Sequence, residues 1–138
     1  MLPGWESLEQ QFAGQLVPLA APSDDQLYAR LEGAGIREVT EFLQTRYQAR
    51  LVSIFGEDRT PAAGVFYIYY VFEAKHTRAY LILQAPISPD QSRFPSLAAG
   101  LPAVNWQERE IQDWFGLEAA GHPNPRQMSL SRSRAHPA

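Results

Sequence analysis

The chain has 138 residues, enough for one domain with a core of its own. Its formal net charge of −3 excludes a mainly electrostatic nucleic-acid binder, because phosphate contacts need a basic surface. It contains no cysteine, which excludes disulfides and thiolate-held zinc or iron–sulfur clusters. No apolar run approaches the roughly 20 residues of a membrane span, and the N-terminus lacks a signal-peptide pattern. These features predict a cytoplasmic globular protein.

The first third of the chain shows two helical patterns separated by extended ones. Ile36, Val39 and Leu43 follow the 3.6-residue period of an amphipathic helix, with Arg37 on the water-facing side. Pro18 suits an edge strand, since proline cannot donate a hydrogen bond within a central strand. The next segment alternates like a strand, although a helical turn fits nearly as well. We predict a helix over 6–16, an edge strand over 15–21, a strand over 26–32 and a helix over 36–48.

Three strand-like runs, over 49–55, 65–72 and 77–84, then follow. The link between the last two is short enough for a hairpin, so we expect them to pair antiparallel. Residues 56–59 should close the first strand, and Pro86 should end the sheet region. The aromatic run could serve as a stacking platform for bases. Without a basic surface, half-buried packing in a sheet is the favoured interpretation.

A further helical pattern covers 105–115. Asn105 can cap its start, with Glu108 as the reciprocal capping acceptor, and Gly116 can adopt the left-handed conformation after its end. A helix this short is marginal in water, so it must dock on the rest of the fold. The apolar side chains expected to do so are Ile111, Trp114 and Phe115.

The order of these elements predicts an α+β fold: an antiparallel sheet of about four to five strands with flanking helices. We expect a single domain over 1–126 and a flexible tail over 127–138.

The charged residues of the 105–126 segment allow a chemical interpretation beside the structural one. Glu108 and Glu110 resemble a catalytic carboxylate pair, but residues two apart on a helix point to different faces. His122 has no carboxylate or second histidine at metal-ligand spacing, so an anchoring hydrogen bond is favoured over a metal site. Arg126 is a candidate partner for one of the helix carboxylates, which would hold the 121–126 loop against the helix.

This segment resembles the signature of the respiratory-chain complex I 30-kilodalton subunit, a component of NADH-quinone oxidoreductase. Weaker similarity runs back to about residue 36. Two departures are Trp114, which is bulkier than expected, and Asn124, where aspartate is common. Residues 55–59 and 108–113 look closer to the homologous piece of membrane-bound nickel–iron hydrogenases and formate hydrogenlyase. The residues that carry the signature are Glu108, Arg109, Glu110, Asp113, Phe115, Gly116, Gly121, His122, Pro123 and Arg126.

The resemblance implies a non-catalytic structural subunit of a redox complex. The family subunit docks on the large catalytic subunit, 49-kilodalton-like or hydrogenase-type, and near an iron–sulfur subunit. The chain would then hold no cofactor or metal, with iron–sulfur clusters, nickel–iron or quinone on the partners. It would lie on the cytoplasmic side of the membrane through those partners. The signature residues would form a helix–loop docking surface.

Two alternatives stay open. The chain could be a small independent enzyme that uses Glu108, Asp113 and His122, which requires a deep pocket where the three converge. It could also be a generic adaptor built on the same domain.

Overall fold

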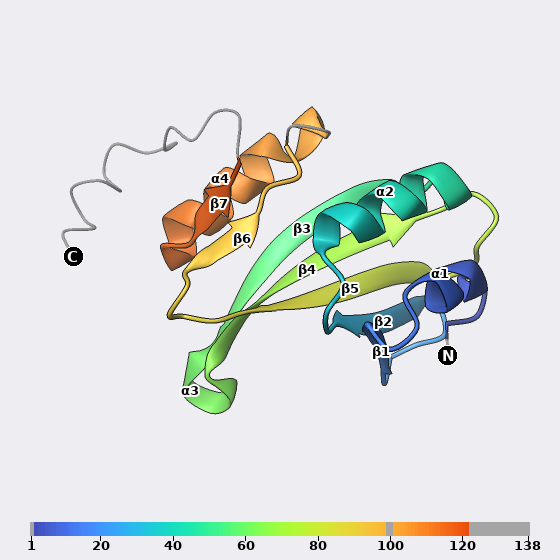
Figure 1. The fold of residues 1–138 in the computed structure, drawn as a ribbon, viewed down its shortest axis with the longest axis horizontal. Helices are drawn as coiled ribbons and strands as arrows, with labels where there is room; N and C mark the ends of the chain where they lie inside the picture. Colours follow the sequence, from blue (N-terminus) through green and yellow to red (C-terminus); the bar gives the residue numbers. More distant parts are fainter. Residues whose placement is uncertain (1, 99–100, 122–138) are drawn as a thin grey trace.

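The computed structural model describes residues 2–98 and 101–121. A five-stranded sheet and a separate two-stranded sheet are flanked by helices (Figure 1), which confirms the predicted α+β class. None of the described helices combines the length and apolarity needed to cross a bilayer. In chain order the elements are α1 (Glu6–Gln11), β1 (Leu16–Leu19), β2 (Gln26–Leu31), α2 (Ile36–Tyr47), β3 (Arg50–Arg59), α3 (Thr60–Ala63), β4 (Val65–Glu73), β5 (Tyr80–Ile87), β6 (Arg93–Pro95), the 3-10 helix η1 (Pro102–Val104), α4 (Asn105–Phe115) and β7 (Glu118–Ala120).

The large sheet has the strand order β1-β2-β5-β4-β3. All neighbours are antiparallel except β2 and β5, which run parallel, so the expectation of a wholly antiparallel sheet is corrected at this pair. The reason lies in α2, which carries the chain back along the sheet so that β3 starts in the same direction as β2. The β3-β4-β5 meander then returns to β2 with β5 in that direction.

The N-terminal helix is shorter than predicted. It ends at Gln11, and Leu16, expected as its last turn, belongs to β1. Gly14 lies between them with a φ of +80°, a left-handed conformation that interrupts a helix. The expected edge position of Pro18 is confirmed, because β1 pairs with β2 alone.

Two strand boundaries also differ from prediction. β3 continues through residues 56–59 instead of closing there, and the chain turns through α3 at the tip of the β3–β4 hairpin (Figure 1). β5 contains Pro86, which pairs with Tyr67 of β4. Proline is tolerated there because β2 pairs with β5 only as far as Gln84, so this end of β5 has a free side.

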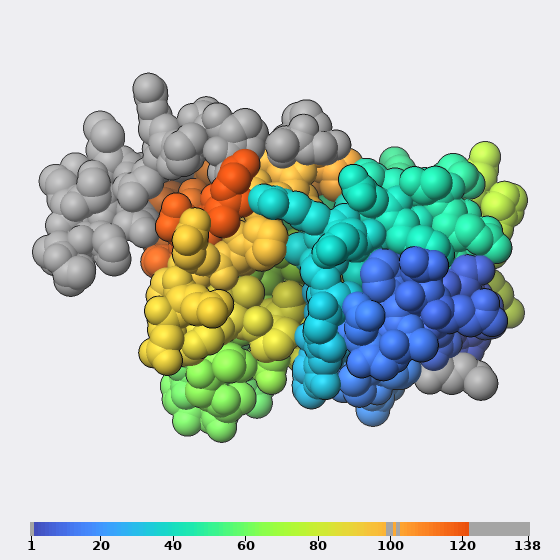
Figure 2. Space-filling model, viewed as in Figure 1, coloured from blue at the N-terminus to red at the C-terminus, as the bar shows by residue number. Residues whose placement is uncertain are grey.

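The two faces of the sheet differ in burial. In β4 the side chains of Ile68, Tyr70 and Phe72 are fully buried, whereas those between them stay half-buried. The predicted half-buried packing of the aromatic run is therefore confirmed. In the view of Figure 2, helix α2, the N-terminal segment and residues 88–98 and 101–121 cover most of the strands β3, β4 and β5. The buried face joins one core with Leu8, Val39, Leu43, Leu81, Leu83, Phe94 and Ile111.

Candidate functional site

Helix α4 directs one carboxylate into the protein. The side chain of Glu108 is fully buried. Its Oε1 accepts a hydrogen bond from the Ser96 hydroxyl at 2.6 Å, and its Oε2 accepts one from the Leu97 backbone N–H at 2.7 Å. The Ser96 oxygen in turn accepts from the Ala98 N–H at 3.1 Å. Glu108 thus anchors the loop that follows β6 against the helix.

The predicted capping of α4 is wrong. Val104 occupies the N-cap position, and no side chain caps the helix start. Asn105 is the first helical residue rather than the cap. The carboxylate of Glu108 satisfies the backbone of a neighbouring loop instead of the N-terminus of its own helix. Because the loop partners are distant in the sequence, a local capping pattern could not reveal them.

Tyr70 of β4 shares the interior with Glu108. Its hydroxyl is buried and has no hydrogen-bond partner among the described residues. Burial raises the pKa of Tyr70 far above its ordinary value, and the negative charge of Glu108 raises it further. The phenol therefore stays protonated, and neither group reaches solvent.

The other charged signature residues of α4 lie nearer the surface. Arg109, Glu110 and Asp113 are all partly exposed, whereas Glu108 is fully buried. The prediction that Glu108 and Glu110 do not converge is thus confirmed. The helix docks through Ile111, which is buried, and Phe115, which is half-buried. The expected docking through Trp114 is wrong, because 77% of that residue is exposed.

The C-terminal end of α4 lies against β3. Gly56 of β3 makes room for the Phe115 ring, since a Cβ at Gly56 would lie 2.5 Å from Phe115 Cε2. The same ring packs against Phe66 with a centroid distance of 5.9 Å. Gly116 then ends the helix with a φ of 71°, as predicted.

A clasp from α2 fixes the small β6–β7 sheet. Arg37 donates from Nε to the Ser96 carbonyl at 2.9 Å and from Nη2 to the Ala120 carbonyl at 2.7 Å. Gly121 has a φ of +82°, and a Cβ there would lie 2.6 Å from Arg37 Nη2. The positive φ favours glycine at 121, and a larger residue there would also displace the Arg37 guanidinium. Periodicity placed Arg37 only on the exposed side of its helix, so sequence reasoning missed the clasp.

His122, Pro123 and Arg126 lie outside the described residues. The predicted contact between Arg126 and the helix carboxylates therefore stays a prediction, as do the expected domain boundary at 126 and the flexible tail.

Residues 29–138 match the family described as "Respiratory-chain NADH dehydrogenase, 30 Kd subunit". The chain belongs to this family. The resemblance inferred from the α4 signature is thereby confirmed. Two signature residues on α4 have structural roles in this 30 Kd-subunit domain. Glu108 anchors the loop after β6, and Phe115 packs against β3.

Curated relatives come from both hydrogenase and NADH-quinone oxidoreductase complexes. Formate hydrogenlyase subunit 5 of Escherichia coli (strain K12) is 30% identical over 125 residues, which cover 90% of this chain and 22% of that protein. Hydrogenase-4 component G of the same organism is 26% identical, with the same coverage. The C component of NADH-quinone oxidoreductase from Roseobacter denitrificans is 32% identical over 72% of this chain and 51% of that one. The chain thus spans about a fifth of the length of the first two relatives.

Two solved structures share the fold. One is the membrane-bound sulfane sulfur reductase, an archaeal respiratory membrane complex, with a TM-score of 0.73 and 18% identity over 93% of this chain and 77% of that one. The other is a trypsin-resistant fragment of Nqo5, with a TM-score of 0.72 and 20% identity over 86% of this chain and 96% of that one.

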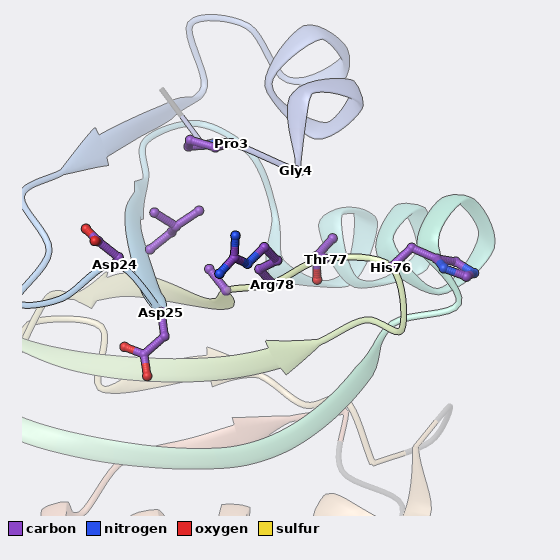
Figure 3. A pocket seen from close by; sticks show the side chains of 9 residues that line it. Pro3, Gly4, Asp24, Asp25, His76, Thr77 and Arg78 are labelled. Carbon is purple, nitrogen blue, oxygen red and sulfur yellow. The ribbon is translucent and has the colours of Figure 1, made fainter.

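The described part of the 30 Kd-subunit domain holds no group of three or more metal-ligating side chains. A hollow of about 440 Å³ lies between the N-terminal residues and the loop before β5. Figure 3 shows that its polar side chains diverge: His76 points away from the side where Asp24 and Asp25 lie, with Arg78 between them. This arrangement does not offer a convergent catalytic or metal site.

The sheet face opposite the core carries a row of polar side chains across four strands. Arg30 Nε donates to Gln84 Oε1 at 2.8 Å, and Gln84 Nε2 donates to the Tyr69 hydroxyl at 3.1 Å. Tyr69 donates to Glu57 Oε1 at 2.7 Å. Burial raises the pKa of Tyr69, and its hydrogen bond to Glu57 raises it further. The row fixes the aromatic ring of Tyr69, on which Phe55 stacks at 5.0 Å.

Beside this polar row the same face is apolar and hollowed. A depression of about 360 Å³ crosses strands β2, β5, β4 and β3, and its lining residues are Gln26, Tyr28, Val52, Phe55, Val71, Tyr80 and Ile82. A smaller hollow of about 90 Å³ follows between β3 and α4, and Phe55 lines both. Sequence reasoning missed this surface, because it depends on the register between four strands. One signal was available in the sequence. In β4 the residues at both odd and even positions are apolar or aromatic, so the face that points away from the core is apolar as well.

Proposed function

We propose that the chain is a non-catalytic structural part of a multisubunit redox complex and docks on the large catalytic subunit of that complex. Family membership supports this proposal, since relatives named as hydrogenase components and NADH-quinone oxidoreductase subunits share the domain. In the two Escherichia coli relatives the matching segment is about a fifth of a longer protein. The matching segment there belongs to the same polypeptide as a larger segment, which is consistent with a docking role.

The observation that carries the proposal is the use made of Glu108. The carboxylate that most resembles a catalytic group is fully buried and holds Ser96 and Leu97 in place. A general acid or base has to come within hydrogen-bond reach of a substrate, which a buried anchor does not do. The independent-enzyme alternative thus loses its central residue.

A hydrogenase-type complex is favoured over an NADH dehydrogenase. The matches to formate hydrogenlyase subunit 5 and hydrogenase-4 component G cover 90% of the chain, whereas the match to the Roseobacter denitrificans relative covers 72%. The additional coverage supports the hydrogenase branch, in agreement with the resemblance of residues 55–59 and 108–113.

The redox groups are assigned to the partners in this proposal. The chain has no cysteine, so it offers no thiolate to an iron–sulfur cluster or to nickel and iron. Clusters, nickel–iron or quinone would be held by the large subunit and a neighbouring iron–sulfur subunit. The complex would place this chain on the cytoplasmic side of the membrane, attached through those subunits.

Purification from the native host tests the proposal. The chain is tagged in its own gene, the complex is extracted with a mild detergent, and the co-purifying proteins are identified by mass spectrometry. We expect a stoichiometric large subunit with paired Cys-x-x-Cys motifs, which identifies the nickel–iron branch. A large subunit without those motifs would indicate the NADH dehydrogenase branch. Recovery of the chain only as a free monomer would contradict the proposal.

A further inference from the structure

Four of the five large hydrophobic residues that are exposed in the described structure lie along the two hollows. We call this group the aromatic strip: Val52, Phe55, Tyr80 and Trp114. Phe55 lines both hollows and so connects the open face of the sheet to helix α4. The fifth residue, Trp106, is 61% exposed on the same helix but lines neither hollow.

The strip is large enough to need an explanation. Phe55 is 47% exposed, Tyr80 42% and Trp114 77%. Because an aromatic side chain offers roughly 150–250 Å² of surface, these three leave on the order of 300 Å² open to solvent. The largest apolar patch on a soluble domain commonly has about this size and is often functional. Tryptophan and tyrosine supply much of the binding energy at protein interfaces.

The charges near the strip restrict the chemistry of its partner. The arginines at the two ends of β3 are already engaged, since Arg50 pairs with Glu73 at 2.6 Å and Arg59 with Glu57 at 3.4 Å. Glu110 lines the hollow next to Trp114. Within residues 2–98 and 101–121 no ion pair engages its carboxylate. Among the described residues that line the two hollows, Glu110 is the one that carries a charge, so this surface offers apolar side chains and a carboxylate.

We propose that the aromatic strip is the surface through which this chain docks, and that its occupant is a segment of the large subunit with apolar side chains beside a lysine or arginine. The basic side chain would meet Glu110 while its apolar neighbours fill the hollows at Phe55 and Trp114. This inference rests on the proposed function. It extends the docking surface from Glu110 and Trp114 on α4 to the open face of the sheet. It leaves out Glu108 and Phe115, because these two signature residues are used inside the domain.

The charge pattern favours the large subunit over a second copy of this chain. A symmetric dimer would present the same face twice. Neither copy would then bring a base from its own hollows to the other's Glu110, because none of the described residues that line the two hollows is basic. A different polypeptide that carries a base complements the surface better.

Three variants of the tagged chain, expressed in the native host, test the inference. Trp114→Glu should lower the yield of large subunit at least about tenfold, because a charge replaces a central apolar anchor. Glu110→Lys should lower it as well, since it would repel the proposed base. Glu41→Lys is the matched control, because it makes the same charge reversal at an exposed glutamate of α2, whose Val39 and Leu43 pack into the core on the other side of the sheet. It should retain the large subunit.

A photo-crosslinking amino acid at position 114 supplies a second measurement. We expect it to link to the large subunit in the intact complex, at a peptide with apolar residues and a lysine or arginine. The same amino acid at position 41 of α2 should give no such link. Circular dichroism of each purified variant checks that the domain is folded. The crosslinking experiment introduces no charge at position 114, so its result does not depend on the stability of a charged variant.

The outcomes separate this inference from the proposed function. If the wild-type chain retains a large subunit and Trp114→Glu retains it equally, the inference is wrong while the proposed function stands. If Glu41→Lys loses as much as Glu110→Lys, or position 114 links to another copy of the chain, the inference is also overturned. If the wild-type chain retains no large subunit, the proposed function itself fails.

Discussion

Replacement of Glu108 tests whether this residue is a structural anchor. Glu108→Ala removes both carboxylate oxygens, leaving the buried Leu97 N–H without its acceptor and the Ser96 hydroxyl without its partner. Hydrogen bonds to charged groups contribute about 1.5–3 kcal/mol each to the free energy of unfolding. From these two bonds we expect a loss of about 3–6 kcal/mol, a large fraction of the stability of a small domain.

Glu108→Gln should cost less, about 1–2 kcal/mol. The amide oxygen can still accept from the Leu97 N–H, while the amide N–H₂ turns toward Ser96. The Ser96 hydroxyl can accept from it but loses the acceptor for its own proton. Glu110→Ala is the matched control, two residues away on the same helix and partly exposed, and should change stability by less than about 0.5 kcal/mol.

Urea unfolding followed by tryptophan fluorescence measures these free energies. Limited proteolysis of the loop after β6 supplies an independent readout, because the loop loses its anchor in the alanine variant. The reasoning is refuted if Glu108→Ala costs no more than Glu110→Ala. It is also refuted if Glu108→Gln costs as much as Glu108→Ala. The glutamine keeps the side-chain shape and an acceptor for the Leu97 N–H, so equal costs would show that this hydrogen bond does not stabilise the fold.

Three further substitutions follow from the buried contacts. Tyr70→Phe should leave stability at pH 7 unchanged or raise it by up to about 1 kcal/mol, because the hydroxyl is buried without a partner. Since the pKa of Tyr70 is raised in the folded state, the wild-type protein should lose stability as pH rises above about 10, and this variant should lose less in urea unfolding at those pH values. Gly121→Ala should cost more than Gly64→Ala in thermal unfolding, because both positions have positive φ but only the first methyl would meet the Arg37 guanidinium; equal costs would contradict the clasp. Gly56→Ala should lower the unfolding free energy by about 1–3 kcal/mol, because the added methyl collides with the aromatic ring at the end of α4; a neutral result would show that α4 can move away without cost.

The structure assigns different roles to the signature residues of α4 than the sequence predicted. From sequence, Glu108 and Glu110 formed one charged motif with an outward docking role. In the fold they separate: Glu108 holds a loop inside the domain, and Glu110 lines a hollow beside Trp114. A family signature is therefore no direct map of a contact surface, because residues that preserve the shape of the domain belong to it as well.

Local patterns predicted the elements whose causes are local. The 3.6-residue period over Ile36, Val39 and Leu43 identified α2, and all three side chains are buried. The helix from 105 to 115 has the predicted bounds, and Gly116 ends it as expected. Predictions failed where a distant partner decides. Pro86 is accepted in β5 only because β2 has already ended beside it, which no local pattern reveals.

The sequence alone determined the helix and strand content of the fold, its family and the lack of thiolate ligands, since periodicity, motif and cysteine content are properties of neighbouring residues or of counts. Tertiary structure alone decided that β2 and β5 are parallel, that Glu108 is an anchor, and that Phe55 and Trp114 share one surface. Each of these depends on contacts between segments far apart in the chain. Strand register and helix docking establish such contacts, and the free energy of the whole core determines both.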